Sequence, residues 1–270
     1  MTRLEEICRA RRDDVAACKG VRSVRDLEQS PGFRAPRRSM AGALRRPAGE
    51  PIRWLCELKK ASPSAGPIRP DLDVAAMAER LVRAGADGLS VLTEGRHFGG
   101  RPEDLQEVRR AVSHPLLQKD FVVDEYQLIE ARAFGADAVL LIIAALDAAH
   151  LRDLSEAARE LGLDRLAEIH GLAELDAALA LGPEMVGVNN RDLRNLEVDV
   201  ATTFAVLPRV PDYVVRIAES GIKDRETVER IADLGGDAIL IGEHLMRAGD
   251  PPRALRELAG RTDDAGPGAS

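Results

Sequence analysis

The chain has 270 residues, 45% of them hydrophobic, and a formal net charge of −7 at pH 7. This length suits one large domain or two small ones with a sizeable core. The acidic balance argues against a nucleic-acid partner, because binding along a phosphate backbone requires an excess of Lys and Arg. No apolar run reaches the length of a membrane span, so no membrane partner is expected.

The first residues, Met1 to Glu6, lack the apolar stretch of a secretory signal. The three cysteines have no paired spacing, which fits a reducing compartment rather than a disulfide framework. The five histidines show no ligand spacing, and no dinucleotide or Walker motif is present. We therefore expect a cytoplasmic protein without a metal or organic cofactor, and we take a monomer as the working expectation.

Residues 1–50 precede the first predicted strand. Leu4, Ile7 and Val15 in a charged background predict a helix, and a looser segment follows near Leu27. We expect these residues to form a helical extension packed on the rest of the chain. The basic stretch 34–46 is interpreted as a solvated loop beside the mouth of the functional site, in preference to a nucleic-acid tail.

Four later segments share one pattern. A glycine that ends a helical pattern, as a C-cap does, is followed within two residues by an acidic residue and then by an apolar strand. These glycines are Gly85, Gly135, Gly182 and Gly235, at intervals of 50, 47 and 53 residues. Each interval has room for two strand–helix units, so the pattern predicts a fourfold repeat of such pairs.

Strands and helices are predicted to alternate over residues 51–260. The predicted strands are 52–59, 88–93, 116–121, 138–143, 165–170, 185–189, 214–219 and 238–241. The predicted helices are 74–84, 105–112, 124–134, 148–161, 172–181, 200–207 and 225–234, and Asp124 with Gln127 is interpreted as a capping box. Eight nearly all-apolar strands indicate an α/β fold, and the even repeat favours a closed (β/α)8 TIM barrel over an open doubly wound sheet. Residues 261–270 are predicted to be a disordered tail.

The segment 57–66 carries the strongest chemical signal. Because a strand alternates its faces, Glu57 and Lys59 leave the first strand on one side, while Cys56 and Leu58 point to the other. A carboxylate and an ammonium at the end of a buried strand require partners or a function. The Ser-Pro-Ser-Ala-Gly turn that begins at Ser62 offers hydroxyls and a close-approach glycine, which suit an anion.

Barrel enzymes place their chemistry at the C-terminal ends of the strands. Polar side chains end seven of the predicted strands, whereas the fourth, which ends near Ile143, is predicted to be an apolar wall. The inward-facing charges at these ends are Glu57, Lys59, Lys119, Glu168 and Glu219. For a single one of these residues, a structural salt-bridge network that closes the barrel would be as good an explanation as a chemical role. Two lysines and three glutamates together favour a chemical role.

A phosphate site is predicted beside the last two strands. Gly221 follows the seventh predicted strand and Gly242 ends the eighth, and residues 242–247 then predict a short extra helix. Free N–H groups at a helix start attract phosphate, and barrels commonly bind phosphate at this place. We therefore prefer a phosphate site to the alternative of two ordinary loop glycines.

Together these motifs resemble the indole-3-glycerol phosphate synthase family. The similar stretches run in order from about Glu57 to about Leu258, and they include 57–64, 90–94, 98–100, 119–127, 168–170, 187–193, 219–222 and 241–247. The predicted N-terminal helix also resembles the segment that this family adds before its barrel. The resemblance implies a TIM-barrel enzyme of tryptophan biosynthesis.

The implied reaction closes a ring. A small phosphorylated aromatic substrate, 1-(2-carboxyphenylamino)-1-deoxyribulose 5-phosphate, would give indole-3-glycerol phosphate, carbon dioxide and water. By this resemblance Lys119 is the general acid at the ketone, Lys59 meets the benzoate carboxylate, Glu168 is the partner acid/base, and Glu57 orients the lysines. The implied substrate-binding residues are Asn189, Arg191, Leu193, Glu219, Phe98 and Phe121, and the implied phosphate-binding residues are Ser62, Ser220, Gly221, Gly242 and Glu243.

Elementary chemistry agrees with these roles. A lysine can protonate a ketone if burial or a neighbouring cation lowers its pKa, so such a shift is expected. The aryl ring needs an apolar slot, and Phe98 and Phe121 both fall at the predicted mouth, although only 3% of the residues are aromatic. Two alternatives stay open here: another phosphate-binding barrel, such as a sugar-phosphate isomerase or lyase, and a non-catalytic barrel that serves as a binding partner.

Overall fold

The computed structural model describes residues 2–192 and 196–261, which form a closed barrel of eight parallel strands. The barrel strands are β1 (Arg53–Leu58), β4 (Gly88–Leu92), β5 (Leu116–Lys119), β6 (Ala138–Ile142), β7 (Asp164–Ile169), β8 (Met185–Asn189), β9 (Val215–Glu219) and β10 (Ala238–Ile241). They follow one another around the ring in chain order, and β10 pairs with β1. The predicted (β/α)8 barrel is therefore confirmed, and the open sheet is excluded.

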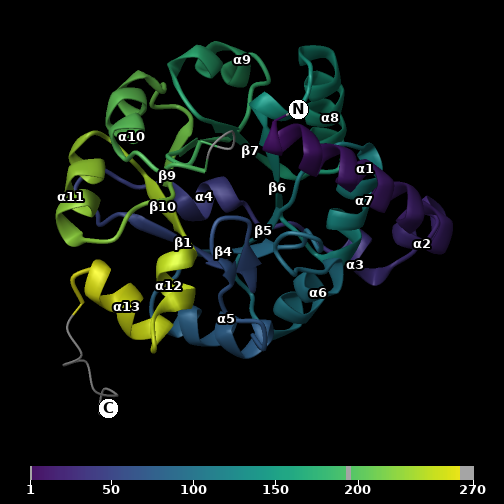
Figure 1. Ribbon diagram of the computed structural model, residues 1–270, viewed down its shortest axis with the longest axis horizontal. Coiled ribbons are helices and arrows are strands. Elements are labelled where there is room, and N and C mark those ends of the chain that lie inside the picture. The colour runs from purple at the N-terminus through teal and green to yellow at the C-terminus, as the bar shows by residue number, and fades with distance from the viewer. Residues whose placement is uncertain (1, 193–195, 262–270) are drawn as a thin grey trace.

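Helices surround this ring of strands (Figure 1). They are α5 (Val74–Arg83), α6 (Pro102–Ala111), α7 (Glu125–Phe134), α8 (Ala148–Glu160), α9 (Leu175–Leu179), α10 (Ala201–Val206), α11 (Arg225–Asp233), α12 (Glu243–Arg247) and α13 (Pro251–Leu258). Short 3₁₀ turns lie at 143–145, 172–174 and 207–209, and a two-stranded hairpin of β2 (Ala61–Ser62) and β3 (Gly66–Pro67) follows β1. None of the helices within the described ranges is long and apolar enough to cross a membrane.

The predicted alternation of faces along β1 is confirmed. Leu55 packs in the apolar cluster inside the barrel, together with Leu117 and Ile217. Its neighbours Trp54 and Cys56 belong instead to the cluster between the strands and the helices. The strand therefore sends Glu57 and Lys59 to the inner side, and the barrel interior below them is apolar.

The fourfold repeat has a structural cause at the N-terminal ends of the strands. In each repeat, the acidic residue before the second strand accepts a hydrogen bond from a backbone N–H at the start of the first strand. The pairs are Asp87 with Trp54, Asp137 with Leu116, Glu184 with Arg165 and Asp237 with Arg216, at 2.8, 2.9, 2.8 and 2.9 Å. Each carboxylate thus ties two neighbouring strands together and satisfies an N–H that the sheet leaves unpaired.

Residues 2–50 contribute four helices before β1, namely α1 (Arg3–Val21), α2 (Val24–Glu28), α3 (Pro31–Arg34) and α4 (Met40–Leu44). Figure 1 shows α1 lying across the α7 and α8 side of the ring. The helix predicted around Leu4, Ile7 and Val15 is present, and all three side chains are buried. The division into an extension (1–50), a barrel (51–260) and a tail (261–270) stays a prediction, and residues 262–270 lie outside the described part of the chain.

The interpretation of 34–46 as a solvated loop beside the functional site is wrong. Met40 and Leu44 are completely buried in the apolar cluster of the barrel interior. The backbone N–H groups of residues 38, 41 and 46 donate to Asp137, Asp164 and Asp237 at 2.9, 2.9 and 3.0 Å. Because these carboxylates lie at strand starts, α4 closes the end of the barrel opposite the strand C-termini.

The carboxylate of Asp137 should be one of the main supports of the barrel. It is 1% exposed and also pairs with Arg109 at 2.8 Å. We predict that Asp137→Asn lowers the free energy of unfolding by about 2–4 kcal/mol, because the amide cannot accept all of these bonds and leaves the Arg109 charge without its partner. Urea unfolding measures the effect, with Asp153→Asn on the exposed side of α8 as the control. Equal stability of the two variants would contradict it.

Candidate active site

A cavity of about 390 Å³ lies at the C-terminal ends of the barrel strands. It brings together nearly all of the predicted site residues: Glu57, Lys59, Phe98, Lys119, Phe121, Glu168, Asn189, Arg191, Glu219, Ser220, Gly221, Gly242 and Glu243. Ser62 instead lines an adjoining cavity of about 60 Å³ that shares Lys59, Phe98 and Phe121 with the first. Leu193 lies outside the described residues.

Lys119 stands at the centre of the cavity's charges. Its Nζ lies 2.7 Å from Glu168 Oε2 and 2.6 Å from Glu219 Oε2, and both carboxylate side chains are 2% exposed. Burial by itself would lower the pKa of Lys119, but Glu168, Glu219 and Glu57 outweigh it and raise that pKa. The expected lowering is therefore not found, and these carboxylates hold the ammonium in its charged form.

The carboxylates of Glu168 and Glu219 both pair with the same ammonium group, that of Lys119. Glu168 is the better paired, because His170 also lies beside it, with Nε2 3.6 Å from Glu168 Oε1. Burial raises the pKa of Glu219, and repulsion by Glu168 adds to this against the attraction of Lys119, so that the pKa reaches about 8. The second oxygen of Glu219, Oε1, is buried and has no hydrogen-bond partner within the described residues. Glu219 thus meets Lys119 through Oε2, while its Oε1 is enclosed against Gly187 of β8.

Glu57 and Lys59 form a second pair on the opposite wall. Their Oε1 and Nζ atoms are 2.6 Å apart, as the shared face of β1 predicts. Gly242 is needed here for a reason that the sequence did not suggest, because a Cβ at this position would lie 2.4 Å from Glu57 Oε1. A substitution at Gly242 would therefore displace Glu57, whatever it did to a bound anion.

An apolar slot lies next to these charges. The rings of Phe98 and Phe121 have centroids 6.1 Å apart and are tilted by 38°. Leu140 and Ile142 of β6, the strand predicted to be an apolar wall, also line the cavity. A flat aromatic group can be buried in such a slot with its polar substituents directed at the lysines.

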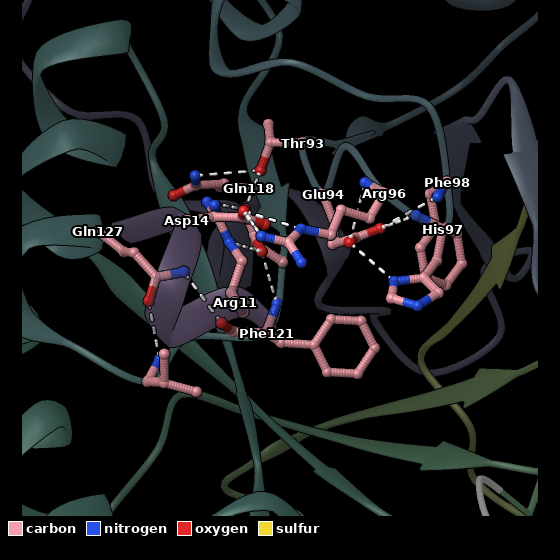
Figure 2. Close-up of polar contacts among 12 residues, drawn as sticks. Arg11, Asp14, Thr93, Glu94, Arg96, His97, Phe98, Gln118, Phe121 and Gln127 are labelled. Carbon is pink, nitrogen blue, oxygen red and sulfur yellow. Dashed lines mark hydrogen bonds and ion pairs between the residues drawn. The ribbon is translucent and has the colours of Figure 1, made fainter. Parts of the chain in front are cut away.

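Phe121 is fixed by polar groups behind the slot (Figure 2). Its N–H donates to Asp120 Oδ1 at 2.8 Å, and Arg11 of α1 holds that carboxylate with two bonds of 2.9 Å. Gln127 donates to the Phe121 carbonyl at 2.9 Å and accepts from the Val123 N–H at 2.8 Å. Gln127 therefore does not complete the predicted capping box; the N-cap of α7, Asp124, bonds the N–H of Tyr126 instead.

The far end of the cavity offers groups that suit an anion. Ser220 and Gly221 both have positive φ, 65° and 78°, and Asn190 donates to the Ser220 carbonyl at 2.9 Å. Lys223, His244 and Arg247 also line the cavity there. These three side chains are not among the residues predicted from the sequence, although basic residues close after Gly221 and Gly242 are a usable signal.

The remaining predicted residues complete this end of the site. Arg191 pairs with Glu243 at 3.1 Å, and Asn189 Oδ1 accepts the Arg191 N–H at 3.0 Å. Within the described residues, no three His, Cys, Asp or Glu side chains are grouped so that they could hold a metal ion. The cavity therefore combines two lysine–carboxylate pairs, an apolar slot and a basic end.

Solved structures with low sequence identity share the fold. Thiamine phosphate pyrophosphorylase from Pyrococcus furiosus aligns with a TM-score of 0.59 and 17% identity, over 82% of this chain and 96% of that one. For 3-hexulose-6-phosphate synthase from Salmonella typhimurium the TM-score is 0.61 and the identity 15%, over 77% and 97% of the two chains. These similarities support the TIM barrel and nothing more specific.

Relatives with high sequence identity extend over nearly the whole chain. The indole-3-glycerol phosphate synthase of Kineococcus radiotolerans is 46% identical over 96% of this chain and 95% of its own length. That of Koribacter versatilis is 44% identical over 95% and 98%. The family model described as indole-3-glycerol phosphate synthase matches residues 4–258. The chain therefore belongs to the indole-3-glycerol phosphate synthase family.

Proposed function

We propose that the cavity at the strand C-termini carries out the family's reaction by general acid/base catalysis, with Lys119 as the central acid. The chain is a decarboxylating carbon–carbon lyase that converts 1-(2-carboxyphenylamino)-1-deoxyribulose 5-phosphate into indole-3-glycerol phosphate, carbon dioxide and water. The family assignment removes both alternative interpretations of the sequence. The observation that carries the proposal is the Lys119 ammonium held between two buried carboxylates at 2.6 and 2.7 Å.

In the first step, the aryl carbon that bears the carboxylate attacks the substrate ketone. The ketone oxygen takes a proton from Lys119, so the new C–C bond forms without an unstabilised alkoxide. The buried glutamates beside Lys119 hold its ammonium inside the cavity before the substrate arrives. Glu168, which directly contacts Lys119 and is ionised, is placed as the partner acid/base to accept the proton that the substrate later loses and to pass it back to Lys119.

Carbon dioxide then leaves, and its bonding electrons restore the aromatic ring. Lys59 is placed to meet the benzoate carboxylate in the ground state, with Glu57 holding its ammonium at 2.6 Å. The hydroxyl formed from the ketone leaves as water after protonation, and a proton lost from the neighbouring carbon completes the indole. Asn189, Arg191 and Glu219 line the part of the cavity in which the substrate's hydroxyls and anilino nitrogen would lie.

The two ends of the substrate fit the two ends of the cavity. The aryl ring would lie in the slot of Phe98 and Phe121. The phosphate would lie at the other end, against Ser220, Gly221 and the basic side chains near them, with Gly242 and Glu243 beside it. Ser62 would contact the substrate only across the adjoining cavity, so its phosphate role is the weakest of the predicted ones.

Several expectations from the sequence stay predictions. They are the absence of a metal or organic cofactor, the absence of a nucleic-acid partner, the monomeric state and the cytoplasmic location. The three cysteines, Cys8, Cys18 and Cys56, are free, as a reducing compartment would require.

We predict that Lys119→Met folds and binds substrate but turns over about 10²–10⁴-fold more slowly, the usual effect of losing a general acid. The measurement is the rise of indole absorbance after the anthranilate-derived substrate is added. Lys19→Met, at an exposed lysine of α1, is the control and should keep the wild-type rate. Near-normal turnover of Lys119→Met would remove this lysine from the mechanism.

We predict an alkaline fall in kcat/KM with an apparent pKa near the value of about 8 to which burial raises the Glu219 carboxyl. Below this pH Glu219 keeps its proton, so the group of Lys119, Glu168 and Glu219 is neutral. Above it the group gains a negative charge, which repels a substrate that carries a carboxylate and a phosphate. The pH profile of Glu219→Gln should lack this limb. An unchanged limb in that variant would assign the titration to another group.

We predict that Lys223→Met weakens the binding of inorganic phosphate by about threefold to tenfold, because a partly solvated cation contributes modestly to an anion site. Calorimetric titration at fixed ionic strength measures the affinity. Arg225→Met, which removes the same charge from the exposed side of α11, is the control. Equal phosphate affinity of both variants and the wild type would locate the phosphate site elsewhere. A substitution at Lys223 is a cleaner test than one at Gly242, because a side chain at Gly242 would also displace Glu57.

A further inference from the structure

Glu94 is a buried carboxylate for which the reaction has no direct use. It lies two residues beyond the end of β4, in the loop that leads to Phe98, and only 1% of its surface is exposed. No lysine or arginine side chain forms an ion pair with it within the described residues. A charge buried in this way needs other compensation.

That compensation comes from the loop itself (Figure 2). Glu94 Oε1 accepts the N–H of Arg96 at 3.1 Å and contacts His97 Nδ1 at 2.9 Å. Glu94 Oε2 accepts the N–H groups of His97 and Phe98 at 2.7 and 3.0 Å. Three successive N–H groups thus converge on one carboxylate, and the last of them belongs to the residue that forms one wall of the aryl slot.

Two further contacts hold the same loop in place. Arg96 pairs with Asp14 of α1, its Nε lying 2.8 Å from Asp14 Oδ1. The carbonyl of Phe98 accepts the N–H of Ala61, the first residue of β2, at 3.1 Å. The loop is therefore bound on both sides, and Glu94 sets its internal shape.

We propose that Glu94 is a positioning residue that acts through Phe98 and thereby sets how tightly the aryl ring of the substrate is bound. This inference rests on the proposed function, in which the ring lies against Phe98 and Phe121. The same device recurs on the other wall, where the Asp120 carboxylate accepts the N–H of Phe121. Each phenylalanine of the slot is thus fixed through its own N–H by a buried carboxylate.

Glu94→Gln is the direct test, because it keeps the shape but replaces one acceptor oxygen by a donor. If the NH2 group replaces Oε2, the N–H groups of His97 and Phe98 both lose their acceptor; if it replaces Oε1, the N–H of Arg96 loses its acceptor, while the His97 ring can keep its contact by accepting at Nδ1. We expect KM to rise about tenfold, with kcat changed by less than about threefold, because the slot binds the ring in the ground state and the transition state alike. The affinity for inorganic phosphate, which does not enter the slot, should stay at the wild-type value.

A double-mutant cycle separates positioning from general destabilisation. If Glu94 acts through Phe98, Glu94→Gln should raise KM no further in a Phe98→Ala background. The matched control is Asp137→Asn, which disturbs an equally buried carboxylate at the opposite end of the barrel and should leave KM unchanged. An equal rise in KM in both backgrounds, or a wild-type KM in Glu94→Gln, would overturn the proposal.

Asp14→Asn provides a second variant if Glu94→Gln does not fold. Asp14 and Arg96 are partly exposed, so the protein should tolerate the change. We expect a rise in KM of about twofold to threefold that is again absent in the Phe98→Ala background. An unchanged KM would contradict the role of the loop. Failure of the wild-type chain to convert the substrate would instead contradict the proposed function.

Discussion

The active site depends on burying three carboxylates and two ammonium groups at one end of an otherwise apolar barrel. An isolated buried charge costs several kcal/mol, so such a group is stable only when its charges nearly cancel. Glu57 is matched by Lys59 and Glu168 by Lys119. Glu219 is the carboxylate in excess, and burial raises its pKa, which favours the protonated form of this third carboxylate. Protonation of Glu219 would bring the site close to neutral.

The backbone makes room for these charges in the same way on two sides of the barrel. A Cβ at Gly187 of β8 would lie 2.1 Å from Glu219 Oε1, on the neighbouring strand β9. A Cβ at Gly242, just after β10, would similarly meet Glu57 of the neighbouring strand β1. Neither glycine has a positive φ angle. Close approach of the neighbouring glutamate, and not a left-handed backbone conformation, therefore requires a glycine at each position. The side chains of Glu219 and Glu57 occupy the space that a Cβ at Gly187 or Gly242 would fill.

Much of this arrangement could be predicted from local patterns. The alternation of faces along a strand placed Glu57, Lys59, Lys119, Glu168 and Glu219 on the inner side, and the glycine–acid repeat indicated a closed barrel. The pKa of Lys119 could not be predicted in this way, because it depends on which carboxylates meet the lysine across the barrel. The location of Glu94 between three N–H groups of its own loop also depends on a turn geometry that no spacing reveals.

The error at residues 34–46 has a different physical origin. The arginines there suggested a solvated segment, but an arginine side chain can reach solvent while its backbone N–H and its apolar neighbours are buried. Met40 and Leu44 were the better signal, since α4 places both inside the barrel. Their burial explains why the strand-start carboxylates have N–H partners outside the sheet.

The N-terminal helices therefore act at both ends of the barrel. At the strand starts, α4 closes the apolar interior and satisfies carboxylates that also join neighbouring strands. At the catalytic end, Arg11 of α1 reaches Asp120, the residue between Lys119 and Phe121. Burial outweighs this pairing and raises the pKa of Asp120, so the ion pair adds little net stability for two charges taken out of water. Its contribution is geometric: it fixes the backbone between the acid lysine and one wall of the aryl slot.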